Sequence, residues 1–159
     1  MFTKLAAAGI LTVALSTAAM AQTATQTVTF QTDAINVISV SGSPTLTINT
    51  AVAGSAPTSV TSSTNSWAVT TNQTGAKITG SIASNMPAGL TLSATLAAPA
   101  GATSAGIQAL STAAVDLVTT ITKLNASSLG LTYQLDATVA AGVVTSSTRL
   151  VTFTITGGV

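Results

Sequence analysis

Residues 129–139 have the sequence LGLTYQLDATV, in which leucine, tyrosine, alanine and valine alternate with glycine, threonine, glutamine and aspartate. Successive side chains of a β-strand point to opposite faces, so the alternation places every large apolar side chain of this stretch on one face. It therefore predicts a half-buried strand with a core side and a solvent side. The same pattern recurs along the chain and decides the fold class.

Shorter copies of the pattern carry threonine or serine on the polar side. They predict further strands at residues 27–30, 45–48, 67–69, 78–82, 90–96 and 151–155. In residues 35–40 the apolar positions change parity, from Ile35 and Val37 to Ile38 and Val40. A change of parity predicts a bulge, or a strand that crosses from one sheet to another.

Clusters of glycine, proline, asparagine, serine and alanine separate these stretches. They lie at residues 41–44, 72–75, 85–89, 98–101 and 140–142, and such residues favour turns for steric reasons. Short alternating strands with turns between them predict an all-β fold, a single antiparallel β-sandwich of about seven to nine strands, immunoglobulin-like or pilin-like. Residues 106–118 also fit a helical stripe, which predicts a short helix there, although residues 115–121 have the β-branched content of a strand.

The first 21 residues have the pattern of a secretory signal peptide. Lys4 supplies a positive charge, residues 5–17 are mainly apolar, and Ala19-Met20-Ala21 forms a small-x-small cleavage site. The apolar run is shorter than the roughly 20 residues that cross a bilayer. We therefore expect cleavage after residue 21, a β-sandwich domain at residues 22–159, and an exported protein of bacterial type, located outside the cell, at its surface or in the periplasm.

The six charged residues that remain after cleavage cancel: Lys77, Lys123 and Arg149 against Asp33, Asp116 and Asp136. Nucleic acid is not expected as a partner, because its binding depends on an excess of basic side chains. No polybasic patch is present either, and we expect no stable membrane insertion after leader cleavage. A net charge near zero removes electrostatic repulsion between copies and so favours self-association.

The sequence contains no histidine and no cysteine, and its three acidic residues are all aspartates. The usual general base, the thiol nucleophile and the commonest ligands of transition metals are thus missing. We predict that the protein is not an enzyme, and we predict no catalytic residue, no metal ligand and no cofactor. Trp67 alternates with Val69, which favours a core position over an exposed platform for a sugar.

The sharpest functional signal lies in residues 22–32, which carry no charge. Ala24, Gln26, Val28 and Phe30 share one parity, and threonines occupy most of the other. One interpretation is a strand-exchange segment, which adds to the open sheet edge of another copy while its alternate side chains fill a groove. The other is an ordinary first strand paired within its own sheet, which the usual pairing of sequential strands favours.

The leader, the threonine-rich segment, the short alternating strands and the closing RLVTFTI of residues 149–155 together form a recognisable pattern. In this pattern the chain resembles the small exported β-sandwich subunits of bacterial surface fibres, the donor-strand pilins and matrix-fibre proteins. The resemblance implies a structural, self-associating role outside the cell, with no substrate. The alternative function is a monomeric secreted binding module that recognises a glycan or a surface partner through its turns.

Overall fold

The structure, a computed structural model, describes residues 21–158. The predicted signal peptide lies outside the described residues except for Ala21, so its cleavage stays a prediction. The chain divides into two units, residues 1–32 and residues 33–159. Every strand of the described chain lies in the second unit.

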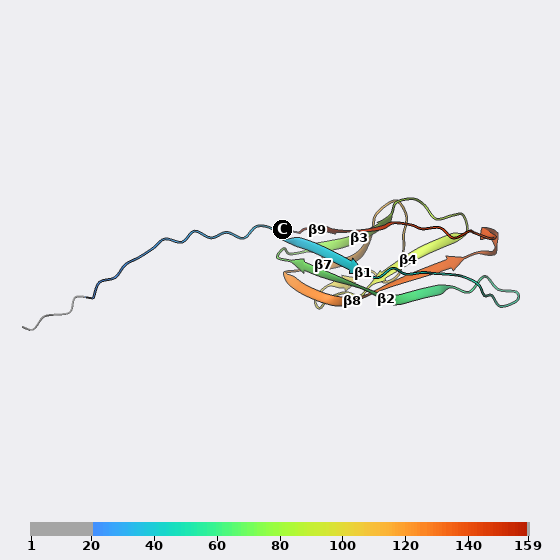
Figure 1. Cartoon of the computed structure of the whole chain (residues 1–159), viewed down its shortest axis with the longest axis horizontal. Coiled ribbons are helices and arrows are strands. Elements are labelled where there is room, and N and C mark those ends of the chain that lie inside the picture. Colours follow the sequence, from blue (N-terminus) through green and yellow to red (C-terminus); the bar gives the residue numbers. More distant parts are fainter. Residues whose placement is uncertain (1–20, 159) are drawn as a thin grey trace, which may run out of the picture. The chain divides into compact units, whose positions relative to one another are not determined.

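Within residues 21–158, nine strands form two antiparallel sheets, whose arrangement can be followed in Figure 1. In spatial order, the five-stranded sheet consists of β1 (Asn36–Ser41), β2 (Val60–Thr71), β8 (Leu124–Ala137), β4 (Leu90–Leu96) and β6 (Gln108–Ala109). The four-stranded sheet consists of β5 (Thr103–Ser104), β7 (Val115–Ile121), β3 (Ala76–Ile82) and β9 (Val151–Thr156). The all-β sandwich expected from the sequence is confirmed.

The core lies between the two sheets and receives side chains from both. Trp67, at 1% exposure, and Leu131 come from the first sheet, and Ile78 and Leu117 come from the second. The alternation that predicted the strands appears directly in β3, where residues 76, 78, 80 and 82 are buried and the residues between them are half-exposed. The interpretation of Trp67 as a core residue is confirmed.

The stretch that opened the sequence argument forms the second half of β8, in which Leu131 and Tyr133 are buried. Its last predicted inward residue, Val139, is instead 77% exposed and begins a short 3-10 turn, η1 (Val139–Ala141). The ladder with β4 ends at the pair Leu90 and Ala137. Beyond that point β8 has no partner strand, so the chain turns away.

The short helix predicted in residues 106–118 is wrong. This part of the chain contains β6 and the start of β7 instead, and Leu110 reaches the core while its amide donates to the Leu92 carbonyl. Two register shifts between β3 and β7 leave extra residues in β7, which is why the consecutive residues Leu117 and Val118 are both buried. Such bulges break the period of two, and a broken period can resemble a helical stripe.

Three other expectations also fail. No strand is assigned at residues 27–30 or 45–48, although Leu46 still packs against the core. The bulge or crossing predicted within residues 35–40 is absent, because β1 pairs with β2 in unbroken register from Asn36 to Ser41. The parity change is tolerated because β1 is an edge strand, where Val37 and Val40 stay 56% and 49% exposed on its two faces.

Candidate functional site

The sandwich is open along one side, between β1 and β9. Each of these strands is the last strand of its sheet, because among the described strands β1 pairs only with β2 and β9 pairs only with β3. The two strands lie side by side (Figure 1) without forming a ladder with each other. Each therefore has a row of backbone amides and carbonyls without ladder partners, and such a row can accept a further strand.

A hollow of about 250 Å³ lies in this opening, lined by Ile38, Ser39, Val40, Val151, Thr152 and Phe153. The lining is mainly aliphatic and aromatic, and it contains no charged side chain. Ile38, Val151 and Phe153 pack against the core from their inner sides, yet all three stay partly exposed. These side chains consequently keep apolar surface in water that another apolar side chain could cover.

Hydrogen bonds tie the start of β1 to the end of β2 and to the turn that follows β2. The Asn36 side-chain amide donates to Gln73 Oε1 at 2.9 Å, and the Thr71 hydroxyl donates to Asn36 Oδ1 at 2.7 Å. Gly157, directly after β9, approaches so closely that a Cβ atom there would stand 2.6 Å from Asn36 Nδ2. The start of β1 and the residue after β9 thus lie close together at this end, while the hollow lies further along β1.

The predicted strand-exchange segment carries exposed apolar side chains. All of residues 21–32 are exposed and none is assigned to a strand. Val28 is 71% exposed and Phe30 is 91% exposed. The interpretation of this segment as an ordinary strand of its own sheet is wrong, whereas strand exchange through Ala24, Gln26, Val28 and Phe30 stays a prediction.

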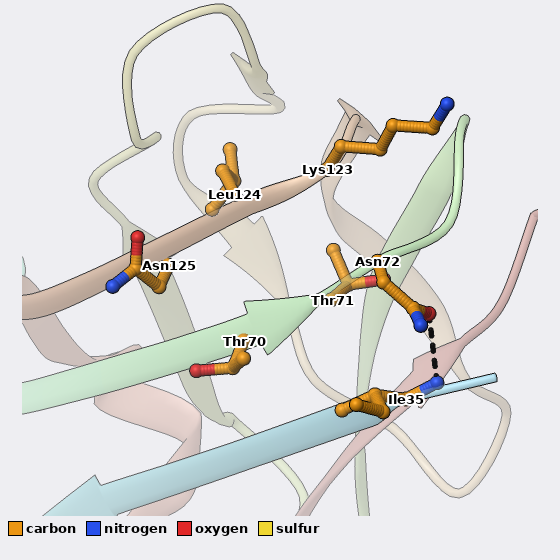
Figure 2. A pocket seen from close by; sticks show the side chains of 7 residues that line it. All are labelled: Ile35, Thr70, Thr71, Asn72, Lys123, Leu124 and Asn125. Carbon is orange, nitrogen blue, oxygen red and sulfur yellow. Dashed lines mark hydrogen bonds between the residues drawn. The ribbon is translucent and has the colours of Figure 1, made fainter. Parts of the chain in front are cut away.

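A second hollow, of about 330 Å³, lies where β1 begins, β2 ends and β8 begins (Figure 2). It is lined by Ile35, Thr70, Thr71, Asn72, Lys123, Leu124 and Asn125. Asn72 is already engaged, since its Oδ1 accepts from the Ile35 amide at 2.8 Å and its Nδ2 donates to the Asp33 carbonyl at 2.8 Å. The Lys123 side chain extends away from the other labelled side chains (Figure 2), and no aromatic ring lines the hollow.

The charged side chains are spread over the second unit. Lys77 Nζ lies 2.9 Å from Asp116 Oδ1, and both side chains are nearly half exposed. Asp136 accepts hydrogen bonds from the Ser59 hydroxyl and from the Gln134 side chain. Within residues 21–158, no group of three acidic, histidine or cysteine residues lies close enough together to hold a metal ion.

The chain was compared with models of protein families, with curated proteins and with solved structures. No protein-family model, no curated protein and no solved structure matches it. Among the described residues, the structure has no helix with the length and apolar character needed to span a bilayer.

Sequence reasoning found the exposed segment but missed the hollow. The alternation identified Ile38 and Val40 in one strand and Val151 and Phe153 in another. Nothing in a single sequence says that these two strands close opposite sheets at the same side of a sandwich, because that depends on the pairing of distant strands. One signal of the edge was present in the sequence. Val37 and Val40 place apolar side chains on both faces of one strand, and such a pattern is compatible with a strand at the edge of a sheet.

Proposed function

We propose that this protein is an exported structural protein, associated with the cell surface, whose copies join by strand addition. Residues 22–32 supply the added strand, and a sheet edge of another copy receives it. The observation that carries the proposal is the exposure of Val28 and Phe30, at 71% and 91%, in a segment without charge. Fully burying each such side chain contributes about 1.5–3 kcal/mol of stabilisation, which favours contact between the segment and an apolar surface of another copy.

The hydrogen bonding of the segment also supports strand addition. Residues 21–30 make no hydrogen bond to any other residue that the structure describes. Addition to a sheet edge would provide ladder partners for these backbone groups while the side chains of one parity become buried. The segment also lacks the lysine and proline residues with which natural edge strands avoid pairing.

Charge supports association of identical copies. The six charged side chains outside the predicted leader sum to zero, three positive and three negative. Identical copies with no net charge have little long-range repulsion to overcome. Apolar contacts and main-chain pairing between copies therefore do not have to overcome a net electrostatic repulsion.

Sedimentation velocity on the chain from Gln22 onward tests the proposal. We expect concentration-dependent oligomers in the unaltered chain and loss of these oligomers in the double variant Val28→Asp, Phe30→Asp. The matched control is Thr27→Asp, Thr29→Asp, which adds the same charge to the same segment on the opposite parity and should keep the oligomers. A chain that stays monomeric, oligomers that survive Val28→Asp, Phe30→Asp, or equal loss in both double variants would each contradict strand addition.

Export is tested separately by expressing residues 1–159 in a bacterium and sequencing the N-terminus of the protein found outside the cytoplasm. We expect that protein to begin at Gln22. Retention in the cytoplasm with residues 1–21 still attached would contradict the exported location.

The rival function is a monomeric binding module, which would use the hollow beside Asn72 and Asn125. Its amide and hydroxyl groups suit a polar ligand, but it offers no aromatic ring on which a sugar could stack. Binding of a glycan by a monomer, lost in Asn125→Ala and kept in Val28→Asp, Phe30→Asp, would favour this function over strand addition.

A further inference from the structure

We propose that the acceptor for residues 22–32 is the opening between β1 and β9 of a second copy, with Phe30 seated in the hollow lined by Ile38, Val40, Val151 and Phe153. This inference rests on the proposed function and names the surface to which the segment adds. It commits to a second copy of this chain as the occupant.

The first argument is the match between hollow and side chain. The hollow has a volume of about 250 Å³ and no charged lining residue. Phe30 is the most exposed aromatic residue of the described chain, and the neighbouring residues of its parity are Val28 and Gln26. An apolar ring of this kind covers apolar surface on Ile38 and Phe153 and loses its own contact with water.

The second argument is the geometry of the edges. β1 and β9 have main-chain rows without ladder partners on the sides that face the opening. β9 consists of six residues, and the alternating part of the segment, residues 24–30, spans a similar length of strand. Backbone pairing along β9 would extend the four-stranded sheet to five, equal to the five strands of the opposite sheet.

The third argument is that the opposite side of the sandwich offers a poorer acceptor. There the edge strands β5 and β6 have two residues each. Strands this short provide few main-chain groups for a partner, which is one of the ways in which natural sheets protect their edges. The edge strands at the opening, β1 and β9, have six residues each and are therefore longer than β5 and β6.

Two variants on β1 test the acceptor. Val40→Asp places a charge in the hollow, whereas Val37→Asp places the same charge on the other face of the same strand at a similar exposure, 49% against 56%. We expect Val40→Asp to lower the fraction of oligomer at a fixed concentration at least tenfold and Val37→Asp to leave it within twofold. Far-ultraviolet circular dichroism checks that both variants are folded, because Trp67 lies opposite Val40 in the ladder and its fluorescence would respond to the charge itself.

Cross-linking gives an independent measurement, because the native chain contains no cysteine. One batch carries Val28→Cys, a second carries Val40→Cys, and a short bismaleimide is added to their mixture. We expect covalent dimers joining residues 28 and 40 of different copies. The control replaces Val40→Cys by Ala109→Cys, on the exposed edge of β6, and should give few dimers.

The outcomes separate the two proposals. If the unaltered chain does not oligomerise, the proposed function fails. If oligomers form and depend on Val28 and Phe30, but Val40→Asp leaves them intact and residue 28 cross-links to residue 109 as readily as to residue 40, the proposed function stands and this acceptor is wrong.

Discussion

Gly80 of β3 lies directly against Leu117 of β7: a Cβ atom on Gly80 would stand 2.6 Å from Leu117 Cδ1 and 3.3 Å from Leu110 Cδ2. The glycine therefore makes room for two leucines in the core. It does so in a strand, where glycine has no conformational advantage and is otherwise unfavourable. Close packing between β3 and β7 is what this position provides.

Replacing Gly80 with alanine should destabilise the sandwich. Extra atoms in a well-packed core force neighbouring side chains out of place, which costs about 1–3 kcal/mol. The matched control is Gly130→Ala, whose new Cβ would meet only the Ala97 Cβ at an ordinary 3.8 Å. Denaturant unfolding of both variants measures the difference, and equal stability in the two would contradict this packing.

Trp67 should be the residue whose truncation affects folding most. It is 1% exposed and pairs with Val40 on one side and Leu129 on the other. Trp67→Ala should lower the free energy of unfolding by about 3–5 kcal/mol. Thermal melting followed by circular dichroism provides the measurement, and an unchanged melting temperature would place the tryptophan outside the core.

Stability should fall at alkaline pH because of Tyr133. Burial raises the pKa of its hydroxyl above the ordinary value of 10.0, so the unfolded chain ionises first as the pH rises. The stabilisation is complete below about pH 10, where both states are protonated, and it is lost as the pH rises through the higher folded value. Tyr133→Phe should remove this part of the pH dependence.

The measurement compares the free energy of unfolding of the two proteins across that range. The two proteins differ only in the hydroxyl of residue 133, so the difference between their curves isolates the tyrosine. Parallel curves for the native chain and Tyr133→Phe would show that burial of the hydroxyl has no such effect.

The ion pair between Lys77 and Asp116 should contribute little. The two side chains are 45% and 46% exposed, and pairs in contact with solvent are typically worth about 0.2–1 kcal/mol. A double-mutant cycle with Lys77→Ala and Asp116→Ala measures the coupling, which added salt should reduce. A coupling well above that range, insensitive to salt, would mean that the pair is shielded from water.

The fold class could be predicted because alternation is a local signal. Residues 90–96 were expected as a strand and form β4 with the same bounds. The alternation was a poorer guide where contacts between distant segments determine the local structure. The bulges of β7 gave it the pattern of a helix, and residues 45–48 alternate without joining a ladder. The short strands β5 and β6 carry too few residues for any period to appear.

The candidate site, too, could be predicted only in part from the sequence. The apolar parity of Val28 and Phe30 is visible in the sequence, because it concerns neighbours along one segment. The hollow that could receive Phe30 is built by Ile38 and Phe153, more than a hundred residues apart. Only the order of strands within the two sheets brings such residues together.

Amide hydrogen exchange of residues 22–32, measured at low and high protein concentration, tests the central claim most directly. If these residues add as a strand to another copy, alternate amides of the segment become protected as the concentration rises, because each then donates to a neighbouring backbone. Exchange as fast as in an unstructured peptide, in a sample that is fully oligomeric, would contradict the account.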